Sequence, residues 1–573
     1  MQGVDEIVSE ALESGQTSLS EIMVKREFGG RVRGYTRMRG MIKYFLEQEV
    51  YVHSLVDSRD NREFVLDPFR CESFDESHSH LRIGRFASRN VYSFTSVPAN
   101  AFFGASLAEA NCEDLFYDNC EEKFENCVIK LYDFTRELGD IDSVDLSEAF
   151  SGVNGHHAIP PEDGPSPTRE LKVNEMLEIV SIVELREATS AKDDMFPKTH
   201  FRNEEDGCEF KDREESKHSL VFHVVSYKRI PNYSPIRCVQ VGYDGFKGGV
   251  LSPRRTCEVL ASLVKAKFPG LESVYDLYEA AVDYIARSVC EENPLLAEYI
   301  LLCICNRRKL QFESDNGLDN QYGSSPISLH ISFCDKGFSV RLRNLLERNL
   351  PRVTWLNLDI SSLNHSPMTP YFDEAKDEFI TGSLQFPLYR NLVVIDETTL
   401  QEGKLTAKGI ENMSNIASLV NYGRVNYGFP AYQVPMETET NNIILSENKK
   451  SVVCGKSGIS IDSRLKAAAR HRSKDKQQFS SEKDFENYLR LYISIVSSCD
   501  EMISFDRSTQ EYIADKFVEI RQKLSSGDNQ VNPGIIHHWL MLSRTQALLN
   551  GEESLTSLRF DKFIQLERER LNI

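Results

Sequence analysis

Two adjacent acids at the end of an apolar run are the residues of this chain whose types and spacing best suit chemistry. The run Leu392–Ile395 reads Leu-Val-Val-Ile, and Asp396 and Glu397 follow it directly. In an ATPase that has a phosphate-binding loop, an Asp at the end of such a strand holds magnesium and a neighbouring acid polarises water. The pair therefore predicts the metal-and-water half of an ATP site.

The phosphate-binding half of that site is missing. The loop requires Gly-x-x-x-x-Gly-Lys-Ser/Thr, because its glycines let backbone N–H groups surround the phosphates. At the place where it belongs, residues 334–339 read Cys-Asp-Lys-Gly-Phe-Ser, with a single glycine and an acid. A second triplet, Gly-Lys-Ser at 455–457, follows the acid-tipped strand instead of preceding it and has Lys450 in place of the first glycine.

We therefore interpret Asp396 and Glu397 as a vestigial pair similar to the Walker B acids, and we expect no catalytic residue and no bound cofactor. A competing interpretation stays open. In it, the two acids only cap the turn after the strand or face solvent.

The net charge limits the partners that the chain can bind. Its 573 residues include 67 Lys and Arg against 87 Asp and Glu, for a net charge of −20. Affinity for nucleic acid comes from clustered Lys and Arg, so we expect no direct sequence-specific nucleic-acid binding. An acidic protein is better suited to basic protein surfaces. The 40% hydrophobic content is typical of globular domains, and the length predicts more than one of them.

Neither a membrane nor secretion is indicated. Residues Met1–Ile7 are acidic and lack the cationic and apolar segments of a signal peptide. The longest apolar stretch, Leu295–Cys305, contains Glu298 and is shorter than the roughly 20 residues of a membrane span. The 13 cysteines are odd in number and form no framework, which predicts reduced thiols in the cytosol or nucleus.

Metal-binding residue types occur without metal-binding spacing. The tight paired spacing of structural zinc sites is absent, so we expect no metal. The residues that could be imagined as zinc ligands are Cys71, His78 and His80, and separately Cys112, Cys120 and Cys127.

The first half of the chain has the composition of β-strands separated by long polar loops. Strands are expected within 32–70, 91–98, 128–132, 171–180 and 220–225, although the spacing from Met38 to Phe45 also fits a short helix. We predict an N-terminal β-rich region at 1–138, a polar linker at 139–170, and a continuation of the β region at 171–251 with an insertion at 192–218. Such a pattern favours a small Greek-key barrel such as an OB-fold.

The second half alternates helices and strands. Helical spacing around 259–264, 274–286, 295–306 and 340–346, with strands at 327–333, 353–360, 391–397 and 441–446, predicts a parallel α/β domain at 252–460. A basic linker at 461–480 follows, then a helical bundle at 481–573. Arg464–Lys476 holds six Lys or Arg, which suits a nuclear import signal, a nucleic-acid patch or a solvated linker.

Several segments resemble the family of minichromosome maintenance (MCM) complex-binding proteins. The strongest block comprises Thr381–Pro387, Leu392–Glu397, Thr399–Leu405, Gly409–Asn412, Ile416–Leu419 and Val425–Phe429, with further matches at Leu296–Leu301 and Ser328–Ser332. The second half is also similar to the MCM helicase subunits, both to the first helices of their ATPase domain and to their helical lid. These matches are Val274–Tyr278, Ile285–Val289, Tyr488–Ile493, Phe517–Arg521 and Leu542–Ala547.

The resemblance implies a multidomain α+β protein with an OB-like β region, a degenerate AAA+ core and a C-terminal helical lid. It also implies a nonenzymatic nuclear partner of the MCM helicase. Such a partner mimics a helicase subunit and regulates assembly or disassembly of the MCM complex in DNA replication, with roles in sister-chromatid cohesion and the cell cycle. Two alternatives stay open, an active or nucleotide-switched AAA+ ATPase with a nonstandard phosphate loop, and a protein that binds single-stranded DNA through its OB-like half.

Overall fold

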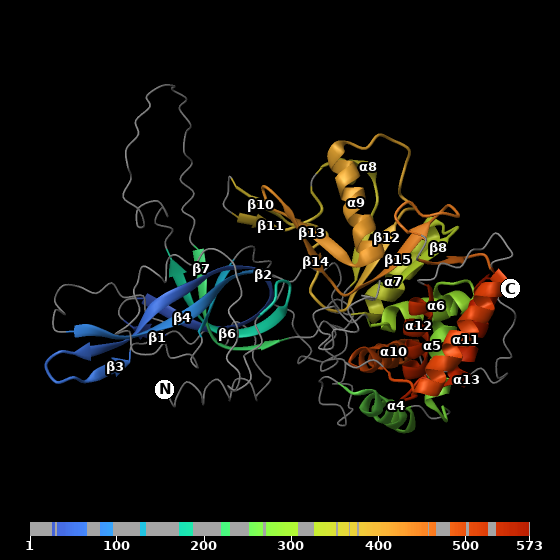
Figure 1. Cartoon of the computed structure of the whole chain (residues 1–573), viewed down its shortest axis with the longest axis horizontal. Coiled ribbons are helices and arrows are strands. Elements are labelled where there is room, and N and C mark those ends of the chain that lie inside the picture. Colours follow the sequence, from blue (N-terminus) through green and yellow to red (C-terminus); the bar gives the residue numbers. More distant parts are fainter. Residues whose placement is uncertain are drawn as a thin grey trace. The chain divides into compact units, whose positions relative to one another are not determined.

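The chain divides into two compact units in the computed structural model, and each is described by itself (Figure 1). The first comprises 1–97 and 118–230, and the second comprises 98–117 and 231–573. The structure describes residues 26–28, 31–65, 81–95, 127–132, 171–186, 219–229, 251–267, 271–307, 326–350, 353–365, 367–374, 378–455, 458–465, 482–499, 503–524 and 535–571.

The first unit contains a closed ring of five strands. Strand β2 pairs with both β4 and β6, and the ring runs β2, β4, β5, β7, β6 and back to β2. All neighbours are antiparallel except β5 and β7. Two short strands, β1 and β3, pair with β2 outside the ring. The strands are β1 Arg26–Phe28, β2 Arg31–Asp57, β3 Glu63–Val65, β4 Leu81–Thr95, β5 Cys127–Tyr132, β6 Met176–Arg186 and β7 Ser219–Arg229.

The length and the irregularities of β2 close the ring. One stretch of β2, Gly34–Met41, pairs with β6, and Met41–Asp57 pairs with β4 through a ladder that carries several register shifts. Such shifts bend and twist a strand, which lets one strand serve two neighbours and leaves fewer open edges. The short helix that also fits Met38–Phe45 does not form, because these residues belong to β2. The strands predicted in this half are confirmed, except that the one predicted at 171–180 begins only at Met176, because the chain turns at Asn174, whose φ is 67°. The polar segments 139–170 and 192–218 lie outside the described residues.

The second unit is built on a five-stranded parallel sheet with the order β16, β8, β15, β12, β9. The predicted parallel α/β arrangement is confirmed. The fifth strand, β16, is an addition to the four that the sequence predicts. The strands are β8 Ser328–Ser332, β9 Thr354–Asn357, β12 Asn391–Asp396, β15 Thr440–Ser446 and β16 Ile459–Asp462.

Helices from both ends of the second unit share one hydrophobic core with this sheet. Helix α6 is buried along nearly its whole length and packs against β8 and β15 and also against α10, α12 and α13. The C-terminal helices that the sequence predicts are therefore present and lie against the first helices of the unit (Figure 1). The helices are α4 Pro253–Lys267, α5 Val274–Ser288, α6 Pro294–Cys305, α7 Lys336–Asn349, α10 Glu482–Ser497, α11 Arg507–Leu524, α12 Ile535–Leu549 and α13 Ser557–Leu571.

The buried carboxylate of Glu567 connects three of these helices through hydrogen bonds. Glu567 of α13 accepts hydrogen bonds from the Tyr299 hydroxyl of α6 and from Nε1 of Trp539 in α12, the latter at 2.9 Å. Arg570 forms an ion pair with the same carboxylate. A buried charge is tolerated only when it is paired and hydrogen-bonded. This cluster therefore sets the positions of the three helices relative to one another.

A second, smaller sheet is attached to the parallel one, with the order β11, β10, β13, β14. It consists of two hairpins, because β10 pairs antiparallel with β11 and β13 pairs antiparallel with β14. Its elements and the two helices near it are β10 Tyr371–Asp373, β11 Glu378–Ile380, β13 Arg424–Gly428, β14 Gln433–Glu437, α8 Ile360–His365 and α9 Ala407–Tyr422. Among the described residues, no helix is both long and apolar enough to cross a bilayer.

Candidate functional site

The predicted acid pair lies at the carboxyl edge of the parallel sheet. Strand β12 ends at Asp396, flanked by β9 and β15, and Glu397 follows it. Ligands of open α/β sheets bind beyond the carboxyl ends of the strands. The two acids are therefore at the edge where a ligand would be expected, and their chemistry depends on what surrounds them.

Both oxygens of the Asp396 carboxylate accept hydrogen bonds from the chain itself. The Ser339 hydroxyl of α7 donates to Oδ2. Thr398 donates to Oδ1 through its backbone N–H at 3.0 Å and its hydroxyl at 2.6 Å. The residue is only 3% exposed. Asp396 therefore caps the turn after β12 and fastens α7 to it, as the turn-capping interpretation of the pair expects.

Glu397 holds the loop that follows β15. Its Oε1 accepts hydrogen bonds from the Ser451 hydroxyl at 2.7 Å and from the backbone N–H groups of the next two residues at 3.0 and 3.2 Å. Its Oε2 is buried and makes no hydrogen bond to a described atom. Burial raises the pKa of this carboxyl, and the donors from the loop oppose that shift. Glu397 is thus only 7% exposed, and one of its two oxygens holds the loop.

The connection from β8 to α7 is too short to surround phosphates. Strand β8 ends at Ser332 and α7 begins at Lys336, which leaves three residues between them. The last of these, Asp335, caps the helix by accepting a hydrogen bond from the Phe338 N–H at 2.7 Å. A carboxylate thus occupies the helix N-terminus that would otherwise attract a phosphate.

Arg464 packs against the connection between β8 and α7. The Arg464 guanidinium lies 3.4 Å from the centre of the Phe333 ring and is ion-paired with Asp462 at 2.9 Å. Of the basic run Arg464–Lys476, only its first two residues are described, so its proposed roles stay predictions. Of the Gly-Lys-Ser triplet, only Gly455 is described, and its N–H donates to Asn421 Oδ1 at 3.1 Å.

The sequence did not single out Ser339 and Ser451, the two serines that donate hydrogen bonds to the acids. Ser339 and Ser451 lie 57 and 54 positions away from Asp396 and Glu397, respectively. A short polar residue in a helix or loop carries no pattern of its own. Only the position of Ser339 in the first turn of the helix after β8, where a phosphate loop would place its Ser or Thr, could have pointed to it.

The imagined zinc ligands fall largely outside the described residues. Cys127 is described, is buried, and donates a hydrogen bond to the Phe94 carbonyl. Burial raises the pKa of its thiol to about 12, so it is a poor metal ligand. Within the described part of the chain, no group of three or more His, Cys, Asp or Glu residues is arranged to hold a metal ion.

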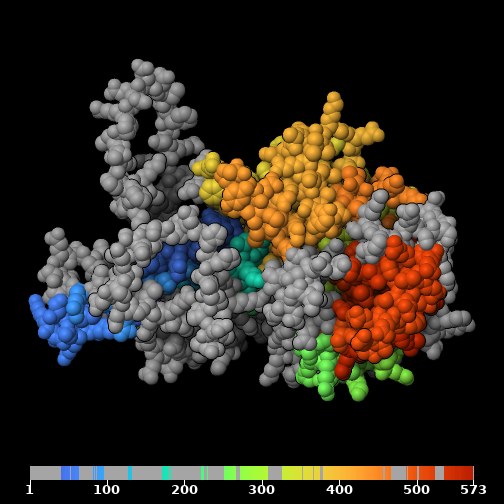
Figure 2. All heavy atoms as spheres, viewed as in Figure 1, coloured from blue at the N-terminus to red at the C-terminus, as the bar shows by residue number. Residues whose placement is uncertain are grey.

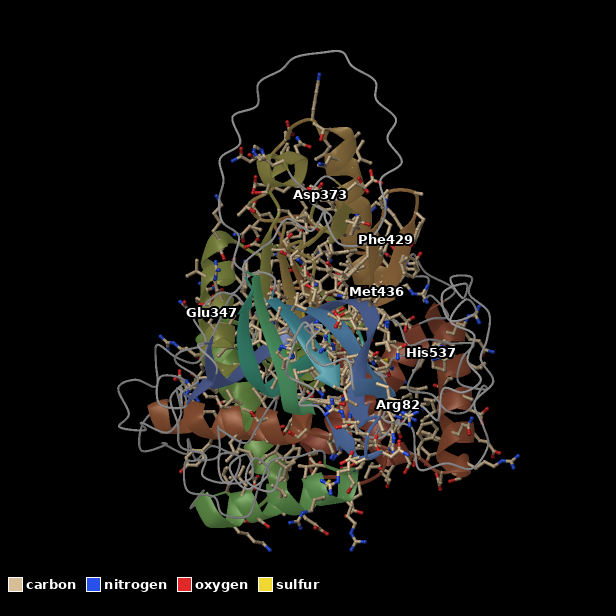
Figure 3. All side chains as sticks on the ribbon, turned by 90° about the vertical axis from the view of Figure 1, so that its left-hand side faces the viewer. Arg82, Glu347, Asp373, Phe429, Met436 and His537 are labelled. Carbon is tan, nitrogen blue, oxygen red and sulfur yellow. The ribbon has the colours of Figure 1, made fainter. Side chains whose placement is uncertain are left out.

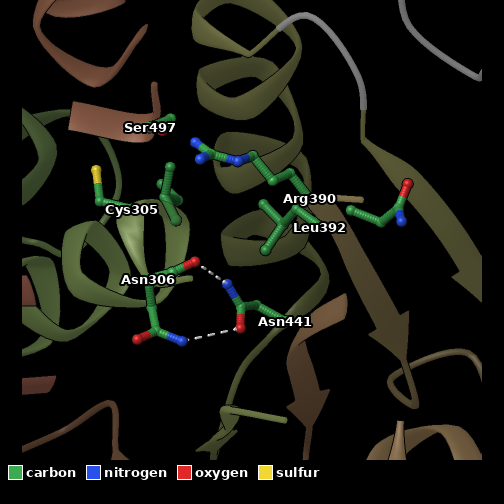
Figure 4. Close-up of a pocket in the computed structure, with 8 residues that line it drawn as sticks. Cys305, Asn306, Arg390, Leu392, Asn441 and Ser497 are labelled. Atoms are coloured by element: carbon green, nitrogen blue, oxygen red, sulfur yellow. Dashed lines mark hydrogen bonds between the residues drawn. The ribbon is translucent and has the colours of Figure 1, made fainter. Parts of the chain in front are cut away.

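A small cavity lies at the opposite, amino end of the sheet (Figure 4). Asn306 and Asn441 line it and bind each other. Asn306 Nδ2 donates to Asn441 Oδ1 at 3.2 Å, and Asn441 Nδ2 donates to the Asn306 carbonyl at 2.7 Å. Arg390 and Leu392 also line it. The cavity volume, counted as the space that the centre of a water molecule can occupy, is about 10 Å³, which is room for about one water molecule. The cavity therefore suits a buried water and not a nucleotide.

The fold and the site together define a class of protein, a multidomain α/β chain with a parallel sheet. The two acids at the end of strand β12 bind other segments of the same chain. Residues 165–573 match the family model described as mini-chromosome maintenance replisome factor, and the chain belongs to this family. The resemblance seen in the sequence is confirmed.

Individual relatives are distant. A protein of Dictyostelium discoideum is 27% identical over 289 residues, which is 48% of this chain and 38% of the relative. A human protein is 25% identical over 246 residues, covering 43% and 37% of the two chains. One from Drosophila melanogaster is 24% identical over 245 residues, covering 41% and 38%. All three are named mini-chromosome maintenance complex-binding protein, and this chain spans well under half of each.

Proposed function

We propose that this chain is a nonenzymatic binding partner of the MCM replicative helicase and that it docks in place of a helicase subunit. Membership of the replisome-factor family supports this proposal, as do the names of the relatives, which are binding proteins of that complex. The net charge of −20 suits a protein partner better than a phosphate backbone.

A degenerate AAA+ core is the part of the proposal that explains subunit mimicry. In the AAA+ arrangement one strand lies between the phosphate-loop strand and the acid-tipped strand, and β15 lies between β8 and β12 here. The hydrogen bond from Ser339 to Asp396 also joins the helix after β8 to the acid of β12. A chain that keeps this framework can present a subunit-like surface to a neighbour.

We assign the first unit to the OB-fold. A five-stranded, partly open barrel with Greek-key connections is the form of that fold. The ring of β2, β4, β5, β7 and β6, with one parallel pair, supports the assignment.

The use of the acid pair to bind the chain's own segments is the observation that carries the nonenzymatic proposal. Both oxygens of Asp396 and one of Glu397 accept hydrogen bonds from the chain, and the short β8–α7 connection leaves no cradle for phosphates. An ATPase needs these acids for magnesium and water. The chain would therefore dock by shape, and no complete ATP site would form at its own edge.

The test combines two variants that keep the shape of the acids. Asp396→Asn and Glu397→Gln remove the charge needed for magnesium and water while preserving most hydrogen bonds. Both variants should co-purify with MCM subunits as the parent chain does, and calorimetry of the parent with ATP and magnesium should show no binding. Loss of the partners from a folded variant, or tight ATP binding with turnover, would favour the alternative of an active or nucleotide-switched ATPase.

The cellular part of the proposal is nuclear action on assembly or disassembly of the MCM complex, with effects on cohesion. The basic run Arg464–Lys476 supports a nuclear location, because clustered Lys and Arg form import signals. Replacing its six basic residues by Gln should move a tagged chain out of the nucleus. Depletion of the chain should change the amount of MCM on chromatin, and an unchanged amount would contradict a role in assembly or disassembly.

A further inference from the structure

Two hairpin turns lie at the same end of the small sheet. Strands β10 and β13 run parallel, and Tyr371 pairs with Gly428, so both strands end on the same side. The turn after β10 begins at Glu374, and the turn after β13 spans Phe429–Tyr432. Figure 3 labels Asp373 and Phe429, which mark the two turns, and in Figure 2 yellow and orange atoms of these hairpins lie at the surface. We call residues 373–374 and 429–432 the hairpin tip.

An exposed aromatic ring at the tip rests on a rigid support. Tyr432 is 60% exposed and stacks on Phe429, with ring centres 4.9 Å apart and planes 10° apart. Phe429 packs edge-on against Phe379 at 5.3 Å. Phe379 is itself buried and contacts the rings of Phe372 and Tyr427. A ring that is already held in place loses little conformational entropy on binding, which is why Tyr is enriched at the centres of interfaces.

The charge around the tip is mainly negative. In sequence, the hairpin at 371–380 holds four acids, Asp373, Glu374, Asp377 and Glu378, against one basic residue, Lys376, and residues 425–436 contain no Lys or Arg. Glu411 of α9 adds a further acid beside the hairpin of β13 and β14, since it accepts a hydrogen bond from Gln433 at 3.1 Å. A phosphate backbone would be repelled from such a surface, whereas a cation would be attracted.

We propose that the hairpin tip is a docking surface for an arginine-bearing segment of a partner protein. A guanidinium can stack on the face of Tyr432 and at the same time donate to the Glu374 carboxylate. Arginine suits the tip better than lysine because its planar group both stacks and forms paired hydrogen bonds. The inference deepens the proposed function and rests on it for the choice of a protein as the partner.

The experiment uses the full chain and three fluorescent probes. These are a short Arg-Gly repeat peptide, the same peptide with Lys, and an oligothymidine strand, each titrated by fluorescence anisotropy. The arginine peptide should bind most tightly. Tyr432→Ala and Glu374→Gln should each weaken it about two- to fivefold, the range expected for an exposed cation–π contact or an exposed ion pair.

Two matched controls separate the tip from general electrostatics. Tyr422→Ala removes a ring that is 64% exposed at the end of α9, and Glu402→Gln removes an exposed acid outside the tip. Both should leave the affinity unchanged. Equal losses in tip and control variants would overturn the inference, as would an oligothymidine strand that binds through Tyr432.

Failure of the docking surface and failure of the proposed function would give different results. A chain that binds the arginine peptide through Tyr432 but co-purifies with no MCM subunit would contradict the proposed function and support the docking surface. A chain that co-purifies with MCM subunits but shows no loss of peptide affinity in the Tyr432→Ala variant would overturn the docking surface alone.

Discussion

Acidic residues lie in two contrasting settings in the second unit, at the carboxyl edge of the parallel sheet and at the hairpin tip. At the edge, Asp396 and Glu397 are 3% and 7% exposed and accept hydrogen bonds from Ser339, Thr398 and Ser451. At the tip, Glu374 is exposed at the end of β10, and Tyr432 stacks on Phe429 in the turn after the adjacent strand β13. The same chemical group therefore serves the fold in one place and is available to a partner in the other.

The difference comes from burial and from the donors within reach. A buried carboxylate must be satisfied by the chain, because an unpaired charge in the interior is costly. An exposed carboxylate is already solvated and can exchange water for a partner at little cost. The predictions below test this contrast, from the largest expected effect to the smallest.

Phe379→Ala should have the largest effect, because it removes the buried ring that supports the tip. Replacing a buried Phe by Ala costs about 3–5 kcal/mol of unfolding free energy. Tyr432→Ala should change that free energy by only about 0.5 kcal/mol, because the ring is exposed. Urea unfolding followed by circular dichroism measures both. Similar costs for the two variants would show that the tip is not built on Phe379.

Asp396→Ala should be the most damaging change at the carboxyl edge. It leaves the Ser339 and Thr398 donors buried without their acceptor and should cost about 2–3 kcal/mol. Glu374→Ala is the matched change at the tip and should stay within about 0.5 kcal/mol of the parent. The same urea titration compares them. An Asp396→Ala chain as stable as the parent would mean that the acid is not structural.

Ser339→Ala should cost less than Asp396→Ala, because one donor is lost and the carboxylate keeps Thr398. A hydrogen bond to a charged group contributes about 1.5–3 kcal/mol. Ser414→Ala, at an exposed position of α9, is the control and should be neutral. In a double-mutant cycle, the losses from Ser339→Ala and Asp396→Ala should not add, because the two residues share one interaction. Full additivity would contradict their contact.

Glu397→Gln should flatten the pH dependence of stability above about pH 4.5. Burial raises the pKa of Glu397 above its ordinary value of 4.5, so the folded chain holds this proton more tightly than the unfolded chain. The stabilisation from the protonated carboxyl is complete below the unfolded pKa and is lost as the pH rises through the raised folded pKa. Unfolding at a series of pH values measures the slope. A variant with the parent's slope would contradict a raised pKa.

Much of the secondary structure was predictable because its segments are long and periodic. Helices such as α5 and α12 bury an apolar face or surface, and strands such as β12 are continuous apolar runs. The short elements were not predictable. Strand β16 contains only two apolar residues, and β10 and β11 have three residues each. Such strands depend on their neighbours in the sheet and carry too little pattern to stand out.

The candidate site was predictable only as a pair of acids at a strand end. The sequence placed Asp396 and Glu397 correctly because a buried parallel strand must be apolar and its polar residues mark where it ends. The tertiary structure decided what they do, since the donors Ser339 and Ser451 come from positions more than 50 residues away along the chain.

By itself the sequence determined the family, the alternation of helices and strands, the missing phosphate loop and the acidic charge, because each is a property of local pattern or composition. The tertiary structure alone decided the closure of the five-stranded ring, the order of the parallel sheet, the hydrogen-bond partners of the acids and the placement of the two hairpin turns at one end of the small sheet. These depend on contacts between segments far apart in the chain, and such contacts leave no local pattern from which they can be predicted.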